Sequence, residues 1–406
     1  ISVLLLAGAN QHAQPVGNMK PPLTIWTSPA LGGKTRRCIQ TCLQEGEQVR
    51  LVLPSELQAQ MARAIPMAEG MPPSTADRAV QSFHAFALEV ALRAGEVHLV
   101  PAHLRRRLLQ EAVREAAPSH PLLERAFQRE GMFTLLSAWV RELAREAISP
   151  QILESLASHS GEPEKIGALA KVWRNYRQLL ARRGWHEEED AYLLAARALR
   201  QPTTGTHLPR RVLLDGFARF SAAEMDFLRA LAEAGCEVVI TLCWDAQRPA
   251  LFESTSATLH WLGEHFEVRQ VPLSAPPAES VSPAIAHIAR HLFGTPPPIT
   301  TMGQGVPAVE IWEAPHLLGE MEMVAREILH LHRNGMAWGE IAVLCRDITS
   351  VLPIAEAMFG QFGIPTQSFE TQVLAEHPLV RALGDLLQIN ADDYPRDGIL
   401  RWLKSG

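Results

Sequence analysis

Runs of hydrophobic residues bounded by turn-forming residues divide the first part of the chain into strands and helices. Residues 23–26, 50–53, 211–214 and 237–242 are mainly apolar or β-branched, the last three after a first charged residue, and each is followed by a loop. Continuous runs of this kind are typical of strands in a parallel sheet that helices cover on both faces. Residues 76–199 instead carry apolar positions three and four apart, which predicts helices. The pattern therefore predicts an α/β fold with a large helical insertion.

The C-terminal part repeats the alternation of strands and helices. Two proline-rich stretches, 274–283 and 295–307, indicate a linker. Predicted strands at 309–312 and 341–344 flank a predicted helix at about 318–333, which indicates a second α/β domain. The expected boundaries are 19–100 with 201–272 for the first domain, 101–200 for its helical subdomain, 273–308 for the linker and 309–406 for the second domain.

Composition narrows the class of protein. The 406 residues are 47% hydrophobic and 20% charged, an ordinary globular balance, and 38 basic against 44 acidic residues give 38 − 44 = −6. A nucleic-acid surface must therefore be a local groove. The five cysteines lack paired spacing, which indicates a reduced, cytoplasmic protein, and no apolar run is long enough to predict a membrane span. We expect residues 1–18 to be a disordered lead or upstream read-through, with Met19 as the start.

A candidate phosphate-binding loop lies between the first strand and a helix. Its two glycines leave backbone N–H groups open to a phosphate, its lysine reaches the phosphates, and its threonine hydroxyl suits Mg²⁺. Ser28 stands where the usual pattern has its first glycine. A surface turn capped by the threonine is the alternative, but the position between strand and helix favours a genuine or vestigial phosphate loop. The candidate nucleotide-binding residues are Gly32, Gly33, Lys34 and Thr35.

Asp215 ends the apolar strand at 211–214 and is followed by Gly216. A carboxylate in this position holds Mg²⁺ in phosphate-loop proteins, so Thr35 and Asp215 are the candidate metal ligands. A simple turn made by the aspartate and the glycine is the alternative. Hydrolases of this type carry a glutamate where Gly216 stands, so fast ATP turnover is not expected. We expect Lys34 and Asp215 to face each other across one pocket, at the carboxyl edge of neighbouring strands.

Two aromatic residues flank His84. Phe83 and Phe86 are candidates for stacking on bases, but their spacing of three is also typical of a core-facing helix side. We expect at least one of them to be core. His84 is either a DNA contact or a structural histidine.

Two charged stretches remain. Arg346 follows the predicted strand at 341–344 and is a candidate for contacting a γ-phosphate; a surface turn with Asp347 is the alternative. The acidic run at 187–190 lacks the spacing of metal ligands and is more typical of charge at a helix N-terminus.

Taken in order, these stretches resemble the motifs of UvrD-type superfamily 1 helicases. They resemble more closely the B-subunit family of AddAB-type helicase–nucleases. Residues 28–35 resemble motif I, 50–63 motif Ia, 82–86 the motif on the DNA side, 212–220 the Asp-Gly-Phe form of motif II, and 341–347 motif IV. The resemblance covers most of the chain from Met19. It implies parallel-sheet P-loop NTPase (RecA-like) domains, the first with a helical insertion and the second truncated.

The resemblance also implies ligands and partners. It assigns DNA binding to Ser55, Phe83, His84 and Phe86, and nucleotide binding to Arg346 beside the loop residues. It further implies ATP, Mg²⁺, single-stranded DNA, duplex ends, and an A-type partner subunit in a heterodimer at the bacterial nucleoid. The nuclease, with its iron–sulfur cluster, would lie beyond Gly406.

Four departures from the family pattern indicate a weak motor. They are Ser28, Gly216, Cys345 in place of an aromatic residue, and the lack of a motif III after residue 242. The predicted function is the N-terminal helicase-like part of a helicase–nuclease subunit in double-strand break repair by recombination, a degenerate motor that binds DNA and is a candidate ATP binder. The alternatives are an active DNA-translocating ATPase, and a P-loop kinase or nucleotide-gated interaction protein without a DNA role. No residue is assigned to catalysis.

Overall fold

The computed structural model divides into two compact units, residues 1–304 and 305–406. The described residues are 20–30, 32–95, 97–117, 131–201, 208–273, 282–293, 309–368, 374, 377–391 and 393–404. The predicted lead at 1–18 and most of the predicted linker fall outside them. A part of the linker that is described, Pro283–His291, forms the helix α14.

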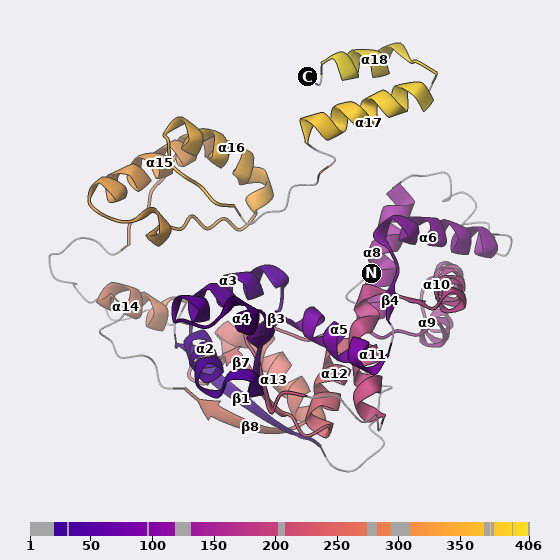
Figure 1. Ribbon diagram of the computed structural model, residues 1–406, viewed down its shortest axis with the longest axis horizontal. Coiled ribbons are helices and arrows are strands. Elements are labelled where there is room, and N and C mark those ends of the chain that lie inside the picture. The colour runs from indigo at the N-terminus through magenta and orange to yellow at the C-terminus, as the bar shows by residue number, and fades with distance from the viewer. Residues whose placement is uncertain are drawn as a thin grey trace. The chain divides into compact units, whose positions relative to one another are not determined.

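A six-stranded sheet forms the centre of the first unit (Figure 1). All its neighbouring strands are parallel, in the order β3-β2-β6-β7-β1-β8. The α/β class predicted from the sequence is thereby confirmed for this unit. The strands are β1 (Pro22–Ser28), β2 (Val49–Leu53), β3 (Val80–Ser82), β6 (Arg211–Leu214), β7 (Glu237–Cys243) and β8 (Glu267–Pro272).

Helices pack on both faces of this sheet because successive side chains of each strand point to opposite sides. Ile25 belongs to one core and its neighbour Trp26 to the other. The core that contains Trp26 is covered by α2 (Lys34–Glu45), α3 (Glu56–Ala68) and α4 (Pro73–Ala79). The core that contains Ile25 is covered by α5 (Phe83–Ala94), α11 (Ala191–Arg200), α12 (Ala222–Glu233) and α13 (Glu253–His265).

The chain between α5 and α11 forms a mainly helical region with its own core. Trp173 and Tyr176 are among its largest buried side chains, and Trp173 Nε1 donates to the carbonyl of Ile148 at 2.9 Å. This region corresponds to the predicted helical insertion. Its elements are β4 (His98–Leu99), α6 (Ala102–Ala116), α8 (Gly131–Arg145), α9 (Pro150–Ala157), α10 (Pro163–Arg183) and β5 (Trp185–His186).

Three residues of the acidic run at 187–190, all except the exposed Glu188, form a buried ionic cluster that joins several helices. The carboxylate of Glu187 is fully buried, accepts from Arg105 at 2.8 and 3.0 Å, and also accepts from the hydroxyl of Tyr176. Arg141 pairs with Glu189 at 2.6 Å, and Arg177 with Asp190 at 2.7 Å. The run also caps the short helix η3 (Glu188–Asp190), which agrees with the predicted charge at a helix N-terminus. The buried ion pairs are an additional role that the prediction did not include.

The second unit is helical in its described part. Its helices are α15 (Leu317–Arg333), η6 (Trp338–Glu340), α16 (Ile348–Gln361), α17 (Pro378–Ala391) and α18 (Arg396–Leu403). Met321 and Ala325 pack against Phe359 in the core between α15 and α16. The predicted strands at 309–312 and 341–344 were wrong: both segments are described without strand pairing. Neither has a partner strand in the described part of its unit, and Ile311 and Leu344 are 95% and 93% exposed.

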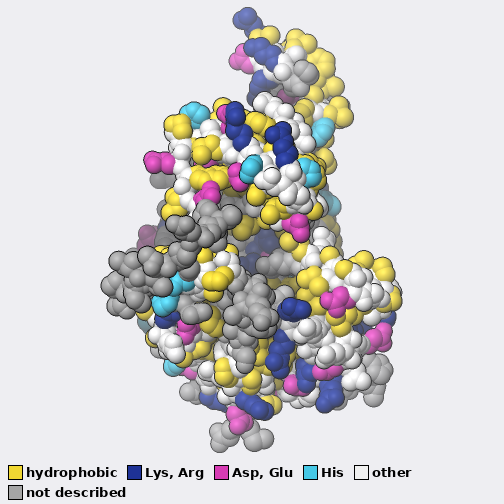
Figure 2. Space-filling model, turned by 90° about the vertical axis from the view of Figure 1, so that its left-hand side faces the viewer, with side chains coloured by type: hydrophobic (Ala, Val, Ile, Leu, Met, Phe, Trp, Pro, Cys, Tyr) yellow, Lys and Arg dark blue, Asp and Glu magenta, His cyan; other side chains and the backbone are white. Residues whose placement is uncertain are grey.

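The distribution of charged side chains on the surface is consistent with the small net charge of the chain. Figure 2 shows acidic and basic side chains scattered over one face of the molecule, between hydrophobic ones. Within the described ranges, no helix is both long and apolar enough for a membrane crossing.

Candidate nucleotide and DNA site

The candidate phosphate loop connects the end of β1 to the start of α2. Gly33 has φ 73°, a left-handed conformation that glycine adopts without strain, and α2 begins at the next residue, Lys34. The strand, turn and helix therefore follow one another as the sequence predicted. Leu31, inside this loop, is not among the described residues.

The side chain of Lys34 turns back onto the loop. Its ammonium donates to the carbonyl of Ser28 at 3.1 Å, to the Ser28 hydroxyl at 3.1 Å and to the carbonyl of Pro29 at 2.9 Å. An ammonium group has three donors, so these contacts can engage all of them. A phosphate that binds here has to replace at least one of these contacts.

Ser28 and Gly32 share the space inside this loop. Ser28 is 2% exposed, and a Cβ added at Gly32 would lie 2.1 Å from the Ser28 Oγ. The serine that replaces the usual glycine is accommodated because Gly32 has no side chain. The Ser28 hydroxyl also places an additional polar atom beside Lys34.

Asp215 lies at the end of β6, where it accepts hydrogen bonds from two threonines. The Thr35 hydroxyl donates to Asp215 Oδ2 at 2.6 Å, and the Thr241 hydroxyl donates to Oδ1. The backbone N–H of Asp215 donates to the Val52 carbonyl at 3.0 Å. The structure thus brings the loop and the aspartate together at the carboxyl edge of the sheet, where parallel α/β sheets place their binding sites.

The expectation of neighbouring strands was wrong. The loop follows β1 and Asp215 follows β6, but β7 lies between these two strands. It is Thr35, rather than Lys34, that contacts Asp215 directly. Burial raises the pKa of the Cys38 thiol on α2, and the negative charge of Asp215 raises it further.

Thr241 is a member of this cluster that the sequence analysis missed. It lies in the buried strand β7, where only 2% of the residue is exposed. Its sequence signal is a hydroxyl inside an otherwise apolar run, because a buried polar group needs a hydrogen-bond partner. The strand order that makes Asp215 its partner is not readable from that signal.

Gly216 has a backbone conformation that disfavours other residues. Its φ is +85°, and a Cβ added there would lie 3.5 Å from Cδ of Pro54. A left-handed conformation costs a residue with a side chain about 1–2 kcal/mol. The turn after Asp215 is therefore built for glycine, and the glutamate of active hydrolases would be strained in it.

The predicted DNA-binding residues lie in different environments. Ser55 is exposed and caps α3 by accepting from the N–H of Gln58 at 3.3 Å. Phe83 and Phe86 are 1% and 2% exposed and pack against Phe227, with ring centroids 5.5 and 5.8 Å away. Both are core residues, which corrects their assignment as stacking surfaces for DNA bases and fulfils the expectation that at least one is core.

His84 has a structural partner. Its Nε2 lies 3.0 Å from the carbonyl oxygen of Glu188, which ties the start of α5 to the ionic cluster at 187–190. Arg346 belongs to the second unit, where its side chain is exposed and the following residue, Asp347, caps α16 by accepting from the N–H of Thr349 at 3.2 Å. The role predicted for Arg346 stays a prediction.

Thr35 and Asp215 supply oxygen atoms, the kind of ligand that Mg²⁺ prefers, and both carboxylate oxygens of Asp215 accept hydrogen bonds from threonines in this structure. Among the described residues, no group of three or more histidine, cysteine or acidic side chains is placed to hold a metal. All five cysteines are free thiols.

The fold and the site define an α/β protein in which a glycine-containing loop and an acidic strand end meet at the carboxyl edge of a parallel sheet, the edge where such sheets place their binding sites. Residues 27–288 match the family model described as "ADDB, N-terminal", so the chain belongs to this family. The chain is similar to proteins named as the B subunit of an ATP-dependent helicase/deoxyribonuclease. It is 27% identical to those of Pelotomaculum thermopropionicum and Desulforudis audaxviator, and 26% identical to that of Bacillus anthracis. Each alignment covers 92% of this chain and 34% of the relative, so the chain spans about a third of the relatives' length.

Proposed function

We propose that this chain is the N-terminal, helicase-like part of a DNA helicase–nuclease subunit that acts in double-strand break repair by recombination. In this role it binds single-stranded DNA and duplex ends, at the bacterial nucleoid, together with an A-type partner subunit. Family membership supports the assignment, and the naming of its relatives as one subunit of an enzyme supports a partner.

The observation that carries the nucleotide part of the proposal is the hydrogen bond of 2.6 Å between Thr35 and Asp215. It joins the two halves of a nucleotide site that lie far apart in the sequence. Gly33 and Lys34 would bind the phosphates of ATP, and Thr35 and Asp215 would hold Mg²⁺. The ion would supply positive charge to the phosphate oxygens when bound.

Slow or absent ATP hydrolysis is part of the proposal. Gly216, with its left-handed φ, stands where active motors carry a glutamate that orients the attacking water. Lys34 is also held by the loop itself. The chain would bind DNA while the partner subunit drives movement, and its second unit would be the start of a second RecA-like domain.

Steady-state ATPase measurements test the motor part. We expect turnover well below one per second, with no more than a small stimulation by single-stranded DNA. Lys34→Ala is the informative variant, and Lys165→Ala is the control because Lys165 forms only a surface ion pair with Glu162. DNA-stimulated turnover of many per second that Lys34→Ala abolishes and Lys165→Ala retains would contradict the degenerate motor.

Titration of a fluorescent single-stranded oligonucleotide at several salt concentrations tests the DNA part. The affinity should fall steeply with the logarithm of salt concentration, because each neutralised phosphate releases a counterion. No binding at low salt would argue against a DNA role for this chain.

A further inference from the structure

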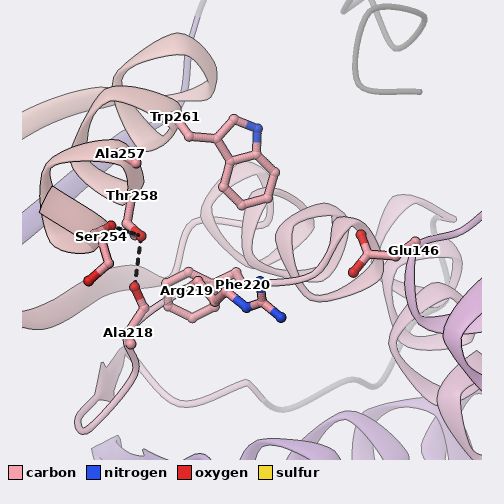
Figure 3. Close-up of a pocket in the computed structure, with 8 residues that line it drawn as sticks. All are labelled: Glu146, Ala218, Arg219, Phe220, Ser254, Ala257, Thr258 and Trp261. Carbon is pink, nitrogen blue, oxygen red and sulfur yellow. Dashed lines mark hydrogen bonds between the residues drawn. The ribbon is translucent and has the colours of Figure 1, made fainter. Parts of the chain in front are cut away.

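A pocket on the first unit carries chemistry that the candidate nucleotide site does not use. Its volume is about 380 Å³, within the range of small-molecule sites. Three segments line it: Glu146 directly after α8, residues 218–220 after β6, and one side of α13 (Figure 3). None of these residues belongs to the phosphate loop.

One wall of the pocket is apolar and held in place. Trp261 extends its ring from α13 into the pocket, and Phe220 lies below it (Figure 3). Phe220 stacks on Phe217, with centroids 5.0 Å apart and ring planes at 19°. The hydroxyl of Thr258 donates to the carbonyl of Ala218 at 2.7 Å, which fixes the loop to α13. The aromatic surface is therefore positioned before any ligand binds.

The polar groups of the pocket have opposite charges. Arg219 is exposed, and its guanidinium forms no hydrogen bond or ion pair with the part of the chain that the structure describes. Glu146 faces the same space and accepts the backbone N–H of Ala222 at 3.3 Å through Oε2. Burial raises the pKa of Glu146, whereas the Ala222 hydrogen bond and Arg219 act in the opposite direction.

We propose that this pocket binds one unstacked nucleobase of single-stranded DNA, with the base on Trp261, a flanking phosphate at Arg219 and the amino group of the base at Glu146. The inference rests on the DNA role proposed above. Base stacking on aromatic side chains is the usual way in which proteins hold single strands. A guanidinium suits a phosphate, and a carboxylate accepts from the amino group of cytosine.

The pocket has a physical connection to the candidate nucleotide site. The loop that carries Arg219 and Phe220 begins at Asp215, which accepts the hydrogen bond from Thr35. DNA in this pocket and a nucleotide at the phosphate loop would contact the two ends of the same short segment.

Fluorescence anisotropy with the full 406-residue chain tests the proposal. The probes are labelled oligo(dC), oligo(dT) and an abasic strand of equal length. Trp261→Ala should lose about tenfold in affinity for oligo(dC) and leave the abasic strand unaffected, because it removes one stacking partner. Arg219→Gln should weaken all three strands and lower the salt dependence by about one phosphate. Glu146→Gln should reduce the preference for oligo(dC) over oligo(dT).

His260→Ala is the matched control, since His260 precedes Trp261 on α13 and its side chain is 82% exposed. It should bind all strands as the wild type does. Melting curves show whether each variant is folded, and Arg219→Gln, at an exposed position, tests the site if Trp261→Ala does not fold.

Two results overturn the proposal in distinguishable ways. If the wild type binds DNA and both Trp261→Ala and Arg219→Gln bind equally well, the pocket is not a DNA contact but the proposed function stands. If the wild type binds no strand at low salt, both fail. Equal affinity of the wild type for oligo(dC) and oligo(dT) overturns the role of Glu146.

Discussion

Replacing Glu187 should destabilise the helical region of the first unit more than any surface change nearby. Its carboxylate is fully buried and is the shared acceptor of Arg105 and Tyr176. In Glu187→Ala, a guanidinium that is 14% exposed and a buried phenol lose their partner together. Removing one member of a buried ion pair costs about 3–5 kcal/mol, and the lower end applies because water reaches Arg105 in part.

For a domain of about 150–250 residues, each kcal/mol of lost stability lowers the melting temperature by about 2–4 °C, so a loss of about 3 kcal/mol corresponds to about 6–12 °C. Circular dichroism at 222 nm during heating measures it, because the affected region is largely helical. Glu188→Ala is the control: this neighbour is exposed, and surface substitutions change stability by about 0.5 kcal/mol or less. Tyr176→Phe, which removes only the hydroxyl, should cost about 1–3 kcal/mol. The reasoning is refuted if Glu187→Ala and Glu188→Ala melt within about 2 °C of each other.

Three other predictions concern backbone strain and the cysteines. Gly216→Ala should lower the free energy of unfolding by about 1–2 kcal/mol because the φ of Gly216 is +85°. Gly167→Ala should raise the free energy of unfolding by about 0.5–1 kcal/mol, because Gly167 lies inside the helix α10. Denaturant titration measures both changes. In the native protein only the half-buried Cys243 and Cys345 should react rapidly with a thiol reagent at pH 8, and all five thiols should react after unfolding. Rapid reaction of a third thiol in the native protein would contradict the burial of the other three cysteines. Burial raises the pKa of Cys42 from 9.0 to about 12. The stability that the neutral Cys42 thiol contributes is therefore complete below pH 9 and is lost as the pH rises towards 12. The urea concentration at the unfolding midpoint should fall across this range, and a constant midpoint would refute the raised pKa of Cys42.

The central strands could be predicted from the sequence because they are buried on both faces. β1, β2, β6 and β7 are each rich in apolar and β-branched residues with few polar ones, which is the pattern that a strand covered by helices on both sides requires. β3 was missed because it has three residues and leads directly into α5. β8 was missed because it is an edge strand whose side chains are partly exposed and largely polar.

The wrong strand predictions have a common cause. Residues 309–312 and 341–344 have apolar composition, but a strand also requires a neighbour that accepts its backbone hydrogen bonds, and composition does not reveal one. The same limit applies to the site. Local patterns identified the motif residues Lys34 and Asp215, which follow β1 and β6. Only the order of the strands shows that β7 lies between β1 and β6, and this position is what brings Thr241 of β7 to Asp215.

The contact between Ser28 and Gly32 has a consequence for how the loop can vary among related chains. An added Cβ at Gly32 would lie 2.5 Å from the Cβ of Ser28 but 3.0 Å from the carbonyl oxygen of Pro29, so the serine is the main obstacle. The two positions can hold one side chain between them, not two. Substitutions there should be interdependent: a chain with glycine at the first position gains freedom at the second, and a chain that keeps serine at the first must keep glycine at the second.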